Sequence, residues 1–216
     1  MTKSDLEVIS SYLGKSWDGK SSILRMQYDN YNQWKQMEWA GFYFQYIIQK
    51  NNDNTFIIPG KTFNKTTFDA HWVESDMPLD VKFHSNRSPK SIYNPNIVLN
   101  DAEAMRNAID AFGRVGVLVV CGDNTYDDNG EFKIWHDSLK GEKSKYVKEG
   151  EAINRNSRMR KVLTKLTHLH FYLIDDSNIN LLGGFQEGMK NSDGSLRRAK
   201  YSLNISSFQP QYTVTL

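Results

Sequence analysis

Two aspartates and a lysine are the residues of this 216-residue chain whose types and spacing most clearly suggest chemistry. They lie in FDAHWVESDMPLDVKFHS, where Asp69 is followed by ten residues, then by Asp80, one further residue and Lys82. Asp is depleted in the interior of strands, and two like charges across a hairpin repel unless a positive charge lies between them. Because Mg²⁺ prefers oxygen ligands, the two carboxylates predict a divalent-cation site with a lysine beside it.

The residues around these side chains predict two paired strands. Residues 66–73 (TTFDAHWV) and 78–85 (PLDVKFHS) alternate with a period of two, and residues 74–77 connect them. Successive side chains point to opposite faces of a strand, so the hairpin has an apolar face that we expect to be buried and a polar face. The apolar face comprises Phe68, Ala70, Trp72, Leu79, Val81 and Phe83. The polar face comprises Asp69, His71, Asp80, Lys82 and His84.

The two histidines of the polar face permit a second interpretation. With Asp69 and Asp80, His71 and His84 form a set of two imidazoles and two carboxylates, which suits Zn²⁺ or Fe²⁺ in a hydrolase. The magnesium interpretation explains Lys82 better, because a lysine in a plain ligand cluster would oppose the cation.

The sequence predicts helices and further strands on both sides of the hairpin. Residues 30–51 predict a long aromatic helix before it, and residues 100–114 an amphipathic helix after it. Residues 115–121 are almost continuously apolar, which is typical of a buried strand, and residues 168–175 and 199–206 predict two more strands. This order predicts an α/β fold with a mixed central sheet flanked by helices.

The composition describes a chain with enough apolar residues for a core and no membrane span. Hydrophobic residues make up 39% of the chain and the mean hydropathy is −0.61, and no apolar run approaches the roughly 18 residues of a membrane helix. The length fits a single domain over residues 1–216. Cys121 is the only cysteine, so no internal disulfide forms, and we expect a cytoplasmic protein with a buried thiol.

The spacing of Asp69, Asp80 and Lys82 resembles the PD-(D/E)xK signature of metal-dependent nucleases, with Phe68 in place of the proline. The segments EWAGFYFQY, KIWHDSLKGEKSKY and NRNSRMRK also resemble type II restriction endonucleases. The family core is a helix, a strand with the first Asp, a strand with D/E-x-K, a helix and a buried strand, which is the order predicted over residues 34–122. The resemblance implies a restriction-endonuclease-like core and Mg²⁺-dependent, sequence-specific hydrolysis of double-stranded DNA.

The resemblance also implies roles for the residues of the motif. Asp69, Asp80 and the carbonyl of Val81 would bind Mg²⁺, which polarises the scissile phosphate and activates a water. Lys82 would contact that water or a phosphate oxygen and offset developing negative charge.

Gln45 occupies the position that aligns with a glutamate on the family's helix before the motif, and we count it with the catalytic residues. It brings no charge, so a second metal is in question. Glu38, Gly41 and Gln45 share one helix face; Glu38 offers an alternative carboxylate, and Gly41 would let the helix approach the sheet closely. Gln45 also favours an alternative function, a DNA-binding protein of this fold without catalysis.

Basic side chains after the hairpin predict the DNA contacts. Residues 140–165 hold nine Lys and Arg against three Glu, in a chain whose net charge is +2, which indicates a local anionic partner. Asn and Arg pair bidentately with adenine and guanine. The candidates are Asn86, Arg87, Lys90, Lys140, Lys143, Lys145, Asn154, Arg155, Asn156, Arg158, Arg160 and Lys161. Restriction enzymes of this type act as symmetric dimers, so the resemblance implies a homodimer.

Overall fold

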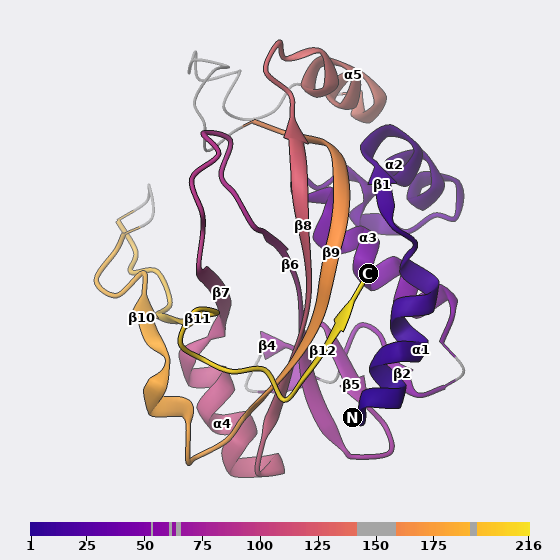
Figure 1. Cartoon of the computed structure of the whole chain (residues 1–216). Helices are drawn as coiled ribbons and strands as arrows, with labels where there is room; N and C mark the ends of the chain where they lie inside the picture. Colours follow the sequence, from indigo (N-terminus) through magenta and orange to yellow (C-terminus); the bar gives the residue numbers. More distant parts are fainter. Residues whose placement is uncertain (53, 61, 64–65, 142–158, 191–193) are drawn as a thin grey trace.

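A curled mixed sheet, flanked by helices on both faces, forms the centre of the molecule (Figure 1). The computed structural model describes residues 1–52, 54–60, 62–63, 66–141, 159–190 and 194–216. The seven-stranded sheet has the order β1-β9-β8-β6-β5-β2, and β12 also pairs with β9. Its strands are β1 (Ser16–Asp18), β2 (Phe56–Ile57), β5 (Ala70–Trp72), β6 (Met77–Ser85), β8 (Val115–Tyr126), β9 (Lys161–Ile174) and β12 (Tyr212–Thr215).

The pairing of β6 with β8 is parallel, whereas the other pairs of this sheet are antiparallel. A parallel pair needs a crossover, and the chain makes it through β7 (Asn96–Asp101) and α4 (Ala102–Phe112). A three-stranded sheet joins β7 to β11 (Lys200–Asn204) and β10 (Gly183–Phe185), next to the 3₁₀ helix η3 (Ile179–Leu181). A two-stranded sheet pairs β3 (Thr62–Phe63) with β4 (Thr66–Thr67).

Two hydrophobic cores lie on the two faces of the large sheet. The first packs α1 (Lys3–Leu13), α2 (Gly19–Tyr28) and α3 (Trp39–Lys50) against it. The second packs α4 and the three-stranded sheet against the other face, and Figure 1 shows the two groups on opposite sides. A further helix, α5 (Glu131–Lys140), lies at one end of the sheet. None of the helices in the described part of the chain is long and apolar enough to span a membrane.

The amphipathic helix and the buried strand after the hairpin form as the sequence predicts. Asp101 caps α4 by accepting a hydrogen bond from the Ala104 N–H at 3.1 Å, and Gly113 ends it in the left-handed region at φ 74°. The strand predicted at residues 115–121 continues to residue 126 as β8. The strand predicted at residues 168–175 begins earlier, at residue 161. Both strands are longer because they pair with each other beyond the apolar run.

The long helix predicted over residues 30–51 is wrong in its first third. The chain forms the 3₁₀ helix η1 (Asn32–Lys35) there, and α3 begins only at residue 39. Asn30 adopts φ 55°, and the backbone is extended at Tyr31 and Gln36. These conformations interrupt the helix although the aromatic pattern continues through them.

The predicted hairpin forms, with Ala70 opposite Leu79 and a connection over residues 73–76, one residue earlier than the sequence predicts. Its apolar face joins the first core, except that Phe68 lies in the second core. The prediction for Phe68 is wrong because this residue precedes β5 and does not follow its pleat. The polar face is not a solvent face: Asp80 is fully buried and His84 nearly so, because β6 is a central strand with packed layers on both sides.

Candidate active site

Asp69, Asp80 and Lys82 meet where β5 begins beside β6. The Lys82 Nζ lies 2.5 Å from Asp80 Oδ1 and 3.4 Å from Asp69 Oδ2. Asp69 directly precedes β5, and its Oδ2 accepts a hydrogen bond from the Val81 N–H at 2.9 Å. The Asp69 side chain therefore satisfies a backbone donor of β6 just past the end of the strand pairing. The fold brings together the three residues that the spacing singled out.

The ionisation of this trio is governed by burial and by charge. Burial raises the pKa of Asp80 to about 7, the nearby Lys82 opposes that rise, and the like charge of Asp69 adds to it. For Lys82, burial alone would lower the pKa, but Asp80 and Asp69 outweigh it and raise the pKa above its usual value. The lysine is therefore charged at neutral pH. In the described residues, the buried Asp80 Oδ2 has no hydrogen-bond partner.

A cavity of about 250 Å³ lies beside the trio, between α3 and β6. Its lining residues are Glu38, Gly41, Phe42, Gln45, Asp69, Val81, Lys82 and Phe83. The predicted helix face therefore lines the same cavity as Asp69 and Lys82, whose side chains are each 27% exposed. Asp80 is buried in contact with Lys82, so a cation entering the cavity reaches the Asp80 carboxylate only where Lys82 gives way.

Gly41 is not required for a close approach of α3 to the sheet. A Cβ at this position would lie 3.9 Å from the Cβ of Phe83, its nearest neighbour. This separation is an ordinary van der Waals contact, so the expected steric reason for the glycine does not hold.

Tyr31 is a residue of this region that the sequence did not indicate. Its hydroxyl lies 3.4 Å from Gln45 Oε1. Burial, followed by the negative charge of Asp69, raises the pKa of Tyr31 to about 12, so the hydroxyl keeps its proton at neutral pH. The break in the helix before α3 places the Tyr31 side chain near Gln45. The prediction of one continuous helix over residues 30–51 did not indicate this contact.

Lys161 and Glu38 form an ion pair at the edge of the cavity. The Lys161 ammonium also lies 5.7 Å from the centre of the Phe83 ring. Its backbone carbonyl accepts a hydrogen bond from Trp39 Nε1 at 2.8 Å, which ties the start of β9 to the start of α3. The cation predicted for DNA contact is thus beside the cavity, already paired with a carboxylate.

Two other predicted DNA contacts are engaged within the protein. Lys140 lies 2.7 Å from Asp137 Oδ1, and its side chain is 9% exposed. Arg160 is buried at 4% exposure, where the charges of Asp137, Glu38 and Asp127 act on it. The prediction that Arg160 contacts DNA does not fit this burial. Its charge is instead influenced by acidic side chains from two segments of the chain, at the start of α3 and at α5.

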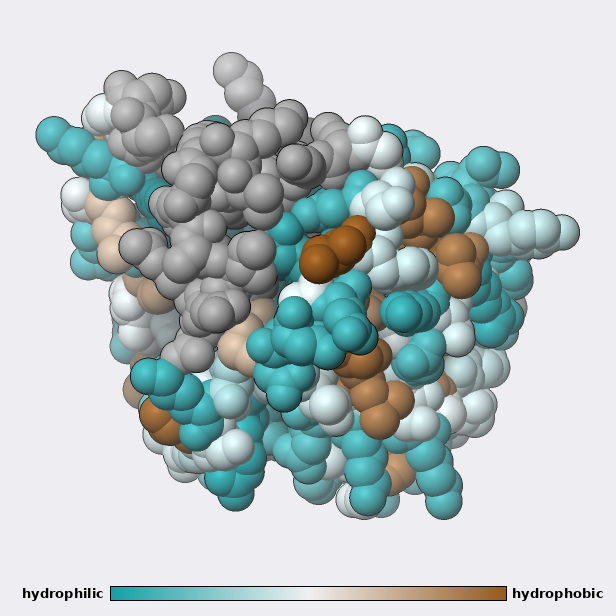
Figure 2. Space-filling model, turned by 90° about the horizontal axis from the view of Figure 1, so that it is seen from above, coloured by the Kyte–Doolittle hydropathy of each residue, from teal (hydrophilic) through white to brown (hydrophobic). Residues whose placement is uncertain are grey.

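The predicted contacts that follow β6 lie nearer the surface. Asn86 Nδ2 donates hydrogen bonds to Asp123 Oδ1 at 3.1 Å and to Thr167 Oγ1 at 3.2 Å. Arg87 is exposed and donates to a backbone carbonyl at 3.0 Å, and Lys90 is exposed. Six further candidates lie outside the described residues: Lys143, Lys145, Asn154, Arg155, Asn156 and Arg158. Figure 2 shows the molecule from above; among the residues coloured there by hydropathy, hydrophilic side chains lie between separate hydrophobic groups.

His71 and His84 do not share a site. The Nε2 of His71 lies 2.7 Å from Asp76 Oδ1, and that of His84 lies 2.8 Å from the Asn94 carbonyl. His71 is opposite Pro78, six residues from His84, which is about 20 Å along a strand. Across the described ranges, no three His, Cys, Asp or Glu side chains form a group suited to hold a metal. The arrangement required for a site of two histidines and two carboxylates is therefore not formed.

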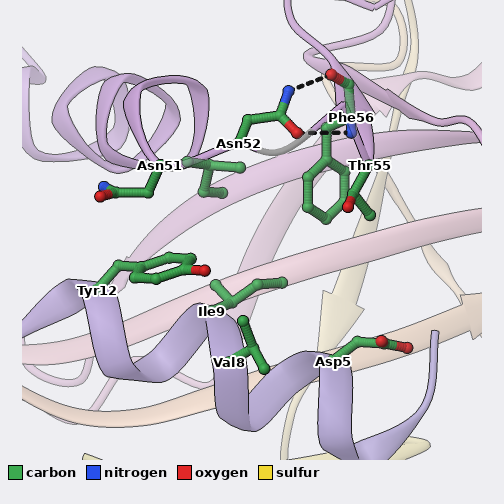
Figure 3. Close-up of a pocket in the computed structure, with 9 residues that line it drawn as sticks. Asp5, Val8, Ile9, Tyr12, Asn51, Asn52, Thr55 and Phe56 are labelled. Carbon is green, nitrogen blue, oxygen red and sulfur yellow. Dashed lines mark hydrogen bonds between the residues drawn. The ribbon is translucent and has the colours of Figure 1, made fainter.

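A second cavity, of about 170 Å³, lies between α1 and the C-terminal end of α3 (Figure 3). Val8, Ile9 and Tyr12 of α1 face Asn51 and neighbouring residues across it. Asn52 holds the backbone of Phe56 through its side chain. None of the residues around this cavity belongs to the trio, so it is separate from the candidate active site.

The candidate active site thus combines the Asp69 carboxylate, a charged lysine and an amide around one cavity, with the buried Asp80 carboxylate in contact with the lysine. Such groups can hold a cation and donate hydrogen bonds to an anionic substrate. Comparison of the chain with models of protein families, with curated proteins and with solved structures found no match.

Proposed function

We propose that this protein is a Mg²⁺-dependent endonuclease of the PD-(D/E)xK type that hydrolyses phosphodiester bonds in double-stranded DNA at specific sequences. The observation that carries the proposal is the meeting of Asp69, Asp80 and Lys82 beside the cavity between α3 and β6. Type II restriction endonucleases are the members that the sequence most resembles. The proposal includes a symmetric homodimer, as is usual for these enzymes, and a cytoplasmic location.

The order of elements supports this assignment. The helix α3, the strand β5 after Asp69, the strand β6 with Asp80 and Lys82, the helix α4 and the buried strand β8 follow one another along the chain. This is the order expected of the restriction-endonuclease-like core. The parallel pairing of β6 with β8, joined through β7 and α4, is consistent with it.

The donor set fits a magnesium ion. Asp69, Asp80 and the carbonyl of Val81 are oxygen donors of the kind that Mg²⁺ prefers. The Asp80 Oδ2 has no hydrogen-bond partner in the part of the chain described, and a buried carboxylate oxygen without a partner is costly unless a proton or a cation joins it. When bound, Mg²⁺ supplies positive charge to the scissile phosphate and lowers the pKa of a water.

The side chains of the site have complementary tasks. Lys82, held charged by two carboxylates, donates hydrogen bonds to a phosphate oxygen or to the attacking water and offsets the negative charge that develops there. Asp69 fixes β6 through the Val81 N–H and so orients the residues on either side of it. The cavity of about 250 Å³ is below the roughly 300–1,000 Å³ of small-molecule pockets. It suits a single phosphodiester group, with the rest of the duplex on the surface.

Incubation of the purified protein with plasmid and Mg²⁺ tests the proposal. We expect discrete fragments from the wild type, no cleavage by Asp80→Ala, and DNA affinity for this variant within a few fold of the wild type. Asp110→Ala, which alters an exposed carboxylate of α4, is the matched control and should cleave normally. Absence of cleavage by the wild type with Mg²⁺, Mn²⁺ and Co²⁺ on several plasmids would refute the proposal.

A DNA-binding protein of the same fold without catalysis is the second candidate. Gln45 favours it, because the helix wall of the cavity has an amide where a catalytic member would have a carboxylate. The carboxylate of Glu38 is paired with Lys161. Calorimetric titration of Mg²⁺ into the protein–DNA complex separates the two candidates. A binding protein shows no metal site that disappears in Asp80→Ala.

A further inference from the structure

Tyr31 is held firmly at the edge of the candidate active site. Its backbone N–H donates to the Met26 carbonyl at 2.8 Å. Its ring packs edge-on against the Tyr46 ring, with centroids 5.6 Å apart. Tyr46 is itself held by a 2.5 Å hydrogen bond from its hydroxyl to Asp29 Oδ2. The position of the Tyr31 hydroxyl is therefore determined by packing that is independent of Gln45.

The hydroxyl of Tyr31 determines which atom of Gln45 is available to the cavity. A side-chain amide has one oxygen that accepts and one nitrogen that donates. The Tyr31 hydroxyl lies 3.4 Å from Gln45 Oε1, at the long end of hydrogen-bond lengths, and it carries a proton to donate. An amide whose oxygen accepts from Tyr31 directs its Nε2 elsewhere. Gln45 lines the same cavity as Asp69 and Lys82, so the group that it offers there is an N–H donor.

The same arrangement bears on the number of metal ions. Divalent cations such as Mg²⁺ bind through oxygen, and on the α3 wall the oxygen of Gln45 faces Tyr31. The other acidic group of that wall, Glu38, is paired with Lys161. Of the two remaining carboxylates, Asp69 lines the opposite wall just before β5, and Asp80 is buried on β6 in contact with Lys82.

We propose that Tyr31 is a positioning residue: it holds Gln45 so that the amide nitrogen donates to a phosphate oxygen, and the site takes one divalent cation. This inference rests on the proposed nuclease function and deepens it. It gives the departure from glutamate at position 45 a role, because a neutral donor binds the substrate where a carboxylate would bind a second metal.

A double-mutant cycle on plasmid cleavage tests the positioning role. Tyr31→Phe and Gln45→Ala should each lower kcat about tenfold, as expected for one lost hydrogen bond in the transition state. KM should be unchanged, and the double variant should be no slower than Gln45→Ala alone. Tyr12→Phe, a partly exposed tyrosine of α1 at the other cavity, is the matched control. Independent effects that multiply in the double variant would overturn the role.

Metal binding provides a readout that does not depend on activity. Calorimetric titration with Mn²⁺ should show one metal site per chain in the wild type. Tyr31→Phe should also show one site, with an Mn²⁺ affinity within twofold of the wild type. Gln45→Glu should show two sites. Two sites in the wild type, or one site in Gln45→Glu, would overturn the inference. A loss of Mn²⁺ affinity in Tyr31→Phe would also overturn it, because that loss indicates a general structural role.

These readouts separate the inference from the function on which it rests. If the wild type binds Mn²⁺ but does not cleave any plasmid, the nuclease proposal fails and the positioning role fails with it. If the wild type cleaves but the cycle shows no coupling, the nuclease proposal stands and the role of Tyr31 alone is overturned.

Discussion

Replacement of Asp80 by asparagine should make the metal-free protein more stable at alkaline pH, although Asp80 is central to the proposed site. The carboxylate is fully buried, and burial raises its pKa from 3.8 to about 7 even with Lys82 beside it. At about 1.4 kcal/mol per pH unit, this rise corresponds to about 4 kcal/mol of unfavourable free energy when the group is ionised. Asparagine resembles the protonated acid and avoids that cost.

The gain in the free energy of unfolding is reduced by the amide group that asparagine introduces. Its amide N–H₂ enters a buried position, and unsatisfied buried donors cost about 1–3 kcal/mol. Lys82 retains Asp69 as a partner at 3.4 Å, so its charge is not stranded. We therefore expect a net gain of about 2 kcal/mol in the free energy of unfolding at pH 8, or about 4–8 °C in Tm for a chain of this size.

The pH dependence follows from the sign of the pKa change. Between about pH 4 and pH 7 the folded protein keeps the proton on Asp80 while the unfolded chain has lost it, so the wild type becomes less stable as the pH rises. Below pH 4 both states are protonated and the contribution is fully present. Asp80→Asn does not titrate, and its buried amide costs about 1–3 kcal/mol at every pH. The variant should therefore be less stable than the wild type by about that amount near pH 4, and more stable by about 2 kcal/mol at pH 8.

Urea unfolding in EDTA at pH values from 4.5 to 8.5 measures this difference. The difference between wild type and variant reports Asp80 together with Asp69 and Lys82, the two groups that interact with it, because the other titrating groups are shared. Asp110→Asn on the exposed surface of α4 should change stability by less than about 0.5 kcal/mol at every pH. A variant less stable than the wild type at pH 8, or a difference that does not change with pH, would refute the reasoning.

Two further predictions concern the cavity and the core. Lys161→Met should lower the slope of log Kd against log salt concentration for DNA binding by about 0.9, as expected for one lost phosphate contact. Filter-binding assays measure this slope. An unchanged slope would contradict a DNA contact at this edge of the cavity. Gly41→Ala should raise the free energy of unfolding by about 0.5 kcal/mol, because a helix favours alanine and the added Cβ has room. Gly116→Ala, whose Cβ would lie 2.3 Å from Leu79 Cδ2, should lower it by about 1–3 kcal/mol, and comparable denaturation curves for the two variants would contradict the packing described.

Much of the candidate site could be predicted because it depends on local geometry. Strand periodicity places Asp80 and Lys82 on one face of β6, and the short connection at residues 73–76 sets the register that brings Asp69 to them. The same register, once known, separates His71 from His84, which periodicity alone had grouped. Periodicity reports the face on which a side chain lies, whereas register decides which residues on that face are neighbours.

Burial could not be predicted from the same pattern. An alternating strand reads as half exposed, but α4 and the three-stranded sheet cover the face that holds Asp80 and His84. Arg160 was grouped with solvent-facing cations because its neighbours in the sequence are basic. In the fold the charges of Asp127 and Asp137 at α5, and of Glu38 at the start of α3, act on it.

The amino-acid sequence by itself determined the order of the helix, the hairpin, the second helix and the buried strand, the trio of Asp69, Asp80 and Lys82, and the helix face that lines the cavity. These features arise from periodicity and short turns, which act over a few residues. Only the tertiary structure decided that Asp80 is buried and that Tyr31 reaches Gln45. Burial depends on which distant layers pack against a strand, and the placement of Tyr31 depends on a backbone break at Asn30 that the hydrophobic pattern does not record.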